Sequence, residues 1–250
     1  MKRNDARRVR RRGPSRAARL RPYWVVLALL LAAGVAAAFF GASWQGFAPK
    51  RVDVIGNSVV PRQDVLLAAG VRTDRSMWLQ DTHAMAGRIE ALPYVADAAV
   101  HRVPPSEIVI VIRERVPLAV ADNGFSSAIV DRNLRVLAPA TQHEKMAHFL
   151  LPPGTPLDPG RTLGDPAPQM AADLDVLTAA QVDVASLEVD KYGQLSATLR
   201  DGTRVLFGDD ADLAAKARLL PTIRAKLAQS PQPVAAIDLR ALATPVVVYK

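Results

Sequence analysis

The chain contains no cysteine. This absence excludes disulfide bonds, thiolate nucleophiles and zinc sites built on thiolates. The sequence also lacks the Gly-x-Ser-x-Gly, Ser-x-x-Lys, phosphate-loop and dinucleotide-binding patterns that mark common catalytic and nucleotide sites. These absences direct attention away from enzyme chemistry and toward binding.

Positive charge is unevenly distributed along the chain. The formal net charge is +8, yet the first 21 residues hold ten Lys and Arg against one acid, Asp5, so residues 22–250 carry −1. Proteins that track nucleic-acid phosphates need a basic residue near each phosphate. A near-neutral body behind a basic arm therefore argues against nucleic-acid binding by the body of the protein.

A long segment after the basic arm has no charged side chain. No charge occurs between Arg21 and Lys50, and residues 23–40 are apolar apart from Gly34. About 20 apolar helical residues cross the hydrocarbon core of a bilayer. Aromatic residues stand at both ends of the segment, where their rings favour the headgroup level. The sequence predicts a transmembrane helix over 23–44.

The arginines before this helix predict its orientation, with residues 1–22 as a cytoplasmic tail. The alternative for the apolar segment is a cleaved signal peptide, for which Ala36, Ala37 and Ala38 offer a small-residue cleavage site. Two roles are open for the tail: topology determinant in contact with anionic lipid, or docking site for a cytoplasmic partner. Ala33, Ala37 and Gly41 form a small-residue stripe suited to packing on another helix.

The order β-α-α-β-β is predicted directly after the apolar segment. The strands are expected over 51–55, 95–103 and 107–116, and the helices over 61–69 and 77–92. Gly70 suits a helix C-cap and Pro93 ends the second helix. The second helix is expected to carry one apolar face, formed by Trp78, Met85, Ile89 and Leu92. Five β-branched residues over 108–112 favour a strand buried on both faces or internal to a sheet.

The second half of the chain is predicted to be rich in strands. A hairpin over 129–137 places Asn133 at a left-handed turn position. An irregular, proline-rich loop is expected over 151–168. Other elements are predicted from period and punctuation: helices over 168–180 and 209–229, a three-stranded meander over 184–190, 194–200 and 203–207, and strands over 234–240 and 245–249. Pro221 is expected to kink the last helix, and Asp209, Asp210 and Asp212 to favour its N-terminus.

A search for reactive side chains yields no catalytic, cofactor-binding or metal-binding residue. His143 and His148 resemble a zinc-protease pair, but positions five apart on a helix diverge by about 140° and do not share a metal. They are interpreted as solvated loop histidines, and His83 and His101 as surface residues. The three acids before residue 213 are interpreted as helix-dipole partners rather than as a cation site.

The remaining candidate for function is the last strand. Pro245 cannot donate to a ladder and suits a sheet edge, and the chain stops at Lys250, so nothing is expected to cover the strand. The predicted partner-binding residues are Arg240, Pro245, Val246, Val247, Val248 and Tyr249. Val246 and Val248 are expected on one side and Val247 and Tyr249 on the other. Either a partner adds a strand here, or the strand only completes the domain's own sheet.

Several segments carry a resemblance to a known family. They are 52–57 (VDVIGN), 92–95 (LPYV), 103–106 (VPPS), 112–119 (IRERVPLA, similar to a V-x-E-R-x-P-x-A strand) and 237–240 (IDLR, similar to a V-D-L-R strand). The first four resemble a POTRA domain, and with the N-terminal anchor the whole set resembles the FtsQ/DivIB family of bacterial cell-division proteins. The sequence departs from the family over 241–245 (ALATP), where the family commonly has a loop with Tyr and Gly.

The resemblance implies an α+β protein: an N-terminal transmembrane helix, a β-α-α-β-β POTRA domain over 49–118, and a mostly antiparallel β domain with a long C-terminal helix over 119–250. It implies a non-enzymatic, cofactor-free scaffold in the inner membrane at the division septum, with its C-terminal domain in the periplasm. The chain resembles the FtsQ of two-membrane bacteria more than the DivIB of Gram-positive bacteria. The implied partners are FtsB- and FtsL-like bitopic proteins and the FtsW/FtsI peptidoglycan synthase.

Two other functions are compatible with parts of the sequence. A POTRA-containing transport or outer-membrane assembly component usually has tandem POTRA repeats, a cleavable signal and a barrel, none of which the sequence indicates. A membrane-anchored hydrolase acting on the cell wall needs a nucleophile, a metal site or a carboxylate pair, and no such motif is recognisable.

Overall fold

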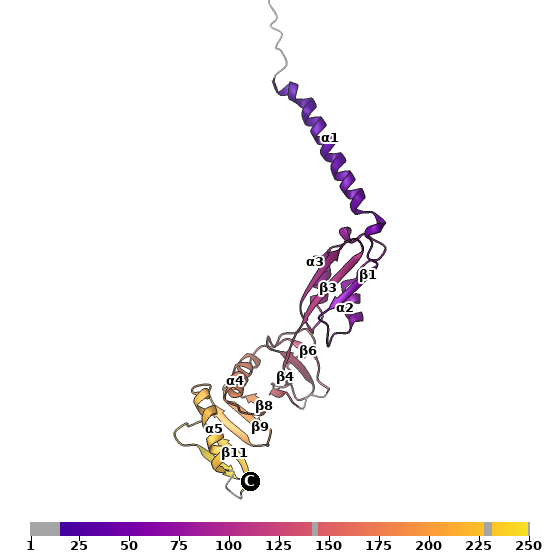
Figure 1. Cartoon of the computed structure of the whole chain (residues 1–250). Helices are drawn as coiled ribbons and strands as arrows, with labels where there is room; N and C mark the ends of the chain where they lie inside the picture. The colour runs from indigo at the N-terminus through magenta and orange to yellow at the C-terminus, as the bar shows by residue number, and fades with distance from the viewer. Residues whose placement is uncertain (1–15, 142–144, 228–231, 250) are drawn as a thin grey trace, which may run out of the picture. The chain divides into compact units, whose positions relative to one another are not determined.

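The computed structural model describes residues 16–141, 145–227 and 232–249, with side chains from residue 23 onward. It begins with helix α1, Arg16–Ala42 (Figure 1). Within α1, Tyr23–Ala42 is long and apolar enough to cross a membrane, and its side chains are exposed. The basic residues before Arg16 lie outside the described residues.

The predicted β-α-α-β-β order is confirmed. It consists of β1 (Arg51–Ile55), α2 (Arg62–Ala69), α3 (Thr82–Glu90), β2 (Val95–Val103) and β3 (Glu107–Glu114), with single turns of 3-10 helix η1 (Gln45–Phe47) and η2 (Met77–Leu79). The three strands form a sheet in the order β1-β3-β2. Ile108, Ile110 and Ile112 of β3 are buried, whereas Val111 is 38% exposed. The strand order makes β3 internal to its sheet, whereas the exposure of Val111 shows that β3 is not buried on both faces.

The predicted helix over 77–92 is corrected by the structure. Residues 77–79 form η2, and α3 begins only at Thr82. The hydroxyl of Ser76 accepts a hydrogen bond from the backbone N–H of Trp78, which caps the short turn. Met85 and Ile89 are buried as expected, but Trp78 is 45% exposed and does not share their face.

The second sheet has nine strands in the order β12-β11-β10-β9-β8-β7-β4-β5-β6. Their bounds are β4 Pro117–Asp122, β5 Ser127–Asp131, β6 Val136–Pro139, β7 Ala147–Leu150, β8 Val184–Val189, β9 Leu195–Leu199, β10 Arg204–Gly208, β11 Val234–Asp238 and β12 Val246–Tyr249. Three neighbouring pairs are parallel (β4/β7, β7/β8 and β10/β11) and the others antiparallel. The sheet is therefore mixed and mostly antiparallel.

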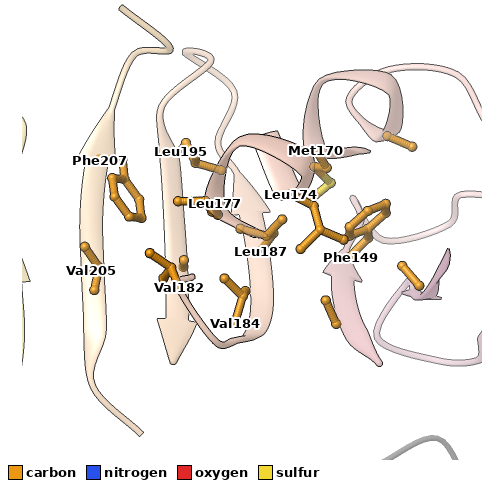
Figure 2. Packing of buried hydrophobic residues seen from close by; sticks show 14 of the residues in the cluster. Phe149, Met170, Leu174, Leu177, Val182, Val184, Leu187, Leu195, Val205 and Phe207 are labelled. Carbon is orange, nitrogen blue, oxygen red and sulfur yellow. The ribbon is translucent and has the colours of Figure 1, made fainter. Parts of the chain in front are cut away.

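Two helices pack on this sheet and cover its core. Leu174 and Leu177 of α4 (Ala167–Ala179) point onto Phe149 of β7 and Leu187 of β8, as Figure 2 shows. Helix α5 (Leu213–Leu227) contains Pro221 and buries Leu213, Ala217 and Leu220. The core also includes Val205 and Phe207 of β10. Each of the Val, Leu and Phe side chains removed from water contributes roughly 1.5–3 kcal/mol.

The acids that were expected to start α5 lie just before it, with none in its first turn. The Asp209 carboxylate and carbonyl, together with the Phe207 carbonyl, instead accept hydrogen bonds from the buried ammonium of Lys216 at 2.8–3.2 Å. The Asp209 and Phe207 oxygens therefore compensate the buried positive charge of Lys216. The expected end of this helix, residues 228 and 229, lies outside the described residues.

The turn between β5 and β6 is a further correction. The residue with a left-handed backbone is Leu134 (φ 60°), not Asn133. The Asp131 carboxylate accepts hydrogen bonds from the N–H groups of Asn133 and Arg135 at 2.9 and 2.8 Å, and the Leu134 side chain is buried. Burial of the leucine and the aspartate clamp offset the cost of an unfavourable backbone conformation.

Candidate partner-binding edge strand

Strand β12 lies at one end of the nine-stranded sheet. It pairs antiparallel with β11, with Val246 opposite Asp238, Val247 opposite Ile237 and Val248 opposite Ala236. Among the described residues, β11 is its only strand partner. The other edge of β12 therefore presents unpaired backbone groups, which is the requirement for adding a further strand.

The side chains of β12 are largely apolar and exposed. Val246 is 56% exposed, Val248 49% and Tyr249 42%. Val247 is half-buried opposite Ile237, which is 1% exposed. The valines alternate as predicted, with Val247 toward the core side and its neighbours toward solvent. An apolar edge strand of this kind is normally blunted in natural sheets, so an exposed one is a candidate binding surface.

The opposite end of the sheet is protected. The proline-rich segment after β7 runs beside β6, where Val136 donates to Arg161 and accepts from Gly160 at 2.7 Å, and Leu163 donates to the Leu134 carbonyl at 2.9 Å. The predicted irregular loop therefore closes this edge. Within the ranges that the structure describes, a loop therefore runs along β6, whereas no segment pairs with the outer side of β12.

The remaining predicted site residues flank β12. Pro245 precedes the strand directly, and the turn before it is closed by a hydrogen bond from Thr244 N to Ala241 O at 3.2 Å. The Arg240 guanidinium binds the Asp238 carboxylate at 2.6–3.0 Å, and these hydrogen bonds lower the pKa of Asp238 against the opposing effect of burial. Arg240 also lies against Gly208 of β10, so its side chain points over the sheet and away from the open edge.

The histidines form no common site in the described part of the chain. His148 lies in β7 and is half-buried, which corrects its assignment to a solvated loop, and His83 and His101 are exposed as expected. His143 and Glu144 lie outside the described residues. Over the ranges given above, no group of three or more potential ligands is placed to hold a metal ion.

Comparison with known proteins separates two regions of the chain. Residues 47–115 match the POTRA domain of FtsQ type, and residues 119–240 match the C-terminal domain of the cell division proteins FtsQ/DivIB. The second match decides between a division protein and other POTRA-containing proteins. The chain belongs to the FtsQ/DivIB family.

Relatives of this FtsQ/DivIB chain occur in mycobacteria and in Caulobacter vibrioides. The cell division protein FtsQ of Mycolicibacterium smegmatis is 33% identical over 178 residues, which cover 70% of this chain and 51% of the relative. FtsQ of Mycobacterium tuberculosis is 30% identical over 181 residues, 70% of this chain and 54% of the relative. FtsQ of Caulobacter vibrioides is 30% identical over 124 residues, 46% and 41% respectively. The chain spans about half the length of the mycobacterial relatives.

The structure explains two residues of the family-like segment 112–119. The Glu114 carboxylate accepts hydrogen bonds from the N–H groups of Ser58, Val59 and Val60 at 2.8–3.0 Å, and so closes the turn before α2. Burial by itself raises the pKa of the Glu114 carboxyl, but these hydrogen bonds outweigh burial and the pKa lies below its usual value. Such bonds to a charged group are individually stronger than neutral ones.

The neighbouring Arg115 joins three segments of the FtsQ/DivIB chain. Its Nε donates to the Val95 carbonyl at 3.0 Å, and its Nη1 binds the Asp131 carboxylate at 2.8 Å. The side chains of Arg115 and Asp131 are only 16% and 5% exposed. Glu114 and Arg115 belong to the segment that resembles the family, but their partners lie far away in the chain, so local sequence patterns do not predict how the pair fixes the structure.

Proposed function

We propose that this chain is a non-catalytic scaffold of the bacterial division machinery, held in the inner membrane by α1. The arginine-rich tail supports an orientation with the N-terminus in the cytoplasm and residues 49–118 and 119–250 as two domains in the periplasm. Membership of the FtsQ/DivIB family supports a place at the division septum. The length and apolar character of Tyr23–Ala42 support the membrane anchor.

The proposed partners are FtsB- and FtsL-like bitopic proteins, which would add a strand to the open edge of β12. The observation that carries this proposal is the pairing of β12 on one side only, together with the exposed Val246, Val248 and Tyr249. Backbone pairing supplies affinity in strand addition, and the alternating side chains supply specificity. Through these partners the protein would help to recruit and regulate the FtsW/FtsI septal peptidoglycan synthase.

The binding test compares proline variants at neighbouring positions of β12. Successive N–H groups of a strand point to opposite edges. One of the two variants Val247→Pro and Val248→Pro therefore removes an N–H group that faces β11. The other, called the outward variant, removes an N–H group that faces the open edge. The full chain in detergent is tested for capture of the extracytoplasmic parts of FtsB and FtsL. The outward variant is recognised by its unchanged melting temperature.

We expect the outward variant to lose FtsB and FtsL while its fold is retained. Leu67→Ser is the matched control, because Leu67 is an exposed apolar residue (79%) on α2, far from β12 in the sequence. This substitution should leave the capture of FtsB and FtsL unchanged. The double variant Val246→Ser with Val248→Ser keeps every backbone donor and is expected to weaken capture without abolishing it. Full capture by the outward proline variant would refute strand addition at β12.

A further inference from the structure

Three aromatic residues from two separate parts of the sequence meet just after α1. The Trp44 and Phe47 ring centroids are 5.7 Å apart in an edge-to-face arrangement, and those of Phe47 and Trp78 are 6.3 Å apart in the same arrangement. Trp44 is 65% exposed and Trp78 45% exposed. We call Trp44, Phe47 and Trp78 the juxtamembrane aromatic cluster.

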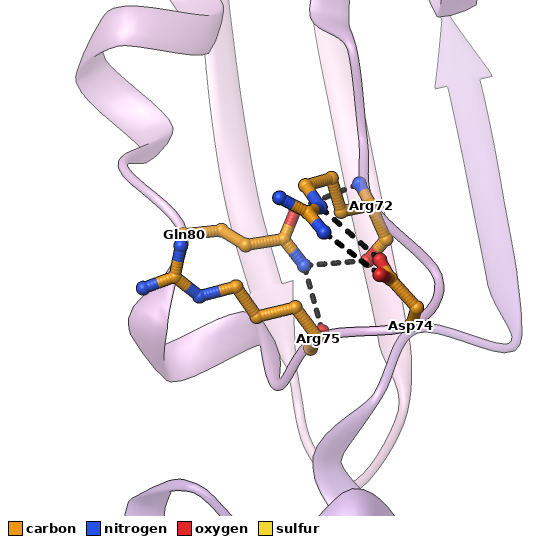
Figure 3. Close-up of polar contacts among 4 residues, drawn as sticks. All are labelled: Arg72, Asp74, Arg75 and Gln80. Atoms are coloured by element: carbon orange, nitrogen blue, oxygen red, sulfur yellow. Dashed lines mark hydrogen bonds and ion pairs between the residues drawn. The ribbon is translucent and has the colours of Figure 1, made fainter.

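The loop that presents Trp78 is held by polar contacts beneath it. The amide of Gln80, which is 6% exposed, donates to the carbonyls of Arg72 and Arg75 at 2.7 and 2.9 Å and accepts from Arg72 N at 2.9 Å (Figure 3). Arg102 donates to the carbonyls of Met77 and Gln80 at 2.8 and 2.5 Å. Satisfied buried networks of this kind rigidify a segment. These contacts therefore hold the loop in the conformation that exposes Trp78.

The position of the cluster along the chain places it near a bilayer. Tyr23–Ala42 is the candidate span, and Trp44 follows its end by two residues. The two ring contacts keep Trp78 within about 12 Å of Trp44, and the headgroup layer is roughly 5–8 Å thick on each side of the hydrocarbon core. This limit exceeds the thickness of the layer, so Trp78 shares the layer with Trp44 where the two rings lie side by side along the membrane plane.

We propose that the juxtamembrane aromatic cluster docks the loop around Trp78 into the headgroup layer of the membrane that α1 crosses. Indole rings have an apolar body and a polar N–H, and they concentrate at this depth. The Cζ atom of Arg102 lies 6.0 Å from the centroid of the Trp78 ring. Two exposed cations are also near in the sequence: Lys50 follows Phe47 by three residues, and Arg75 precedes η2 by two. Phosphate headgroups attract such side chains. The docking restricts how the POTRA-type region moves on its anchor.

The proposal rests on the membrane anchor proposed above, and single-tryptophan variants test the two separately. The chain has three tryptophans, Trp24, Trp44 and Trp78, so Trp→Phe substitutions at two of them leave each one in turn. The full chain is placed in lipid nanodiscs, and quenching of its fluorescence by lipids brominated near the headgroup is compared with quenching by acrylamide. The control is Tyr192→Trp in a chain with all three tryptophans replaced, because Tyr192 is 75% exposed in the C-terminal region.

We expect brominated lipid to quench Trp78 about as strongly as Trp44, and several times more than the control tryptophan. Phe47→Ala in the chain that retains only Trp78 should reduce this quenching while the circular dichroism spectrum is unchanged. Quenching of Trp24 but not of Trp78 would overturn the docking and leave the anchor intact. Loss of quenching at Trp24 would overturn the anchor and the docking together. Protection of Trp78 from acrylamide without quenching by lipid would mean that protein covers the ring, which also refutes the proposal.

Discussion

Replacement of Asp173 by asparagine is expected to make the protein more stable at neutral pH. Asp173 lies on α4, is 5% exposed, and its Oδ2 has no hydrogen-bond partner among the described residues. Burial, and secondarily the negative charge of Asp210, raise the pKa of its carboxyl from 3.8 to about 6. The folded state therefore holds the Asp173 proton more tightly than the unfolded state does.

The sign of the pH dependence follows from this difference. As the pH rises from about 4 to about 6, the unfolded chain releases the proton first, so the free energy of unfolding falls and then stays constant. Each pKa unit corresponds to about 1.4 kcal/mol, which gives a total penalty of about 3 kcal/mol, of which about 2 kcal/mol develops between pH 4.5 and pH 7.5. The amide introduced by Asp173→Asn does not ionise, so the variant is free of this penalty.

The assay is urea unfolding of the full chain in detergent, followed by circular dichroism at several pH values. The stability of Asp173→Asn relative to wild type should improve by about 2 kcal/mol between pH 4.5 and pH 7.5, or about 4–8 °C in melting temperature. Asp175→Asn is the matched control on the same helix, because Asp175 is exposed in an ion pair with Arg132. Its effect should stay below about 0.5 kcal/mol. A difference for Asp173→Asn that does not grow with pH would refute the desolvated carboxylate.

Two further substitutions test the region over 51–114. Gly56→Ala should destabilise the fold by several kcal/mol in thermal melts, because the backbone has φ +89° and a Cβ would lie 2.1 Å from the Ile112 carbonyl oxygen. Gly124→Ala, at φ +80° in open space, should cost only about 1–2 kcal/mol, and equal losses would contradict the steric argument. Glu114→Gln should cost about 1–3 kcal/mol at pH 7. Because the folded pKa of Glu114 is lowered, this cost should shrink as the pH falls below about 4.5, and a cost independent of pH would argue against the charged clamp.

Elements bounded by strong local signals were predictable from the sequence. The predicted strand over 95–103 coincides with β2, because it is bounded by Pro93 before it and by Pro104 after it. The meander of β8, β9 and β10 followed from period-two alternation and two turns containing glycine. The edge position of β12 was also predicted correctly, from Pro245, which cannot donate to a ladder.

Features that depend on distant contacts were not predictable. The apolar spacing around Trp78 matched a helix, but the backbone there is set by the Ser76 cap and by Arg102, which lies more than 20 residues later on β2. Strand β7 was missed because it has only four residues, and its parallel place between β4 and β8 is decided by long-range pairing. For the candidate site, the sequence identified the residues of β12, while the orientation of Arg240 depends on its contact with Gly208.

The most direct test of strand addition is hydrogen–deuterium exchange of the full chain, alone and in complex with FtsB and FtsL. The amides of residues 246–249 should exchange quickly on the open side of β12 in the free protein and become protected in the complex, with little change along β6. Protection that appears elsewhere while these amides exchange as in the free protein would contradict the account.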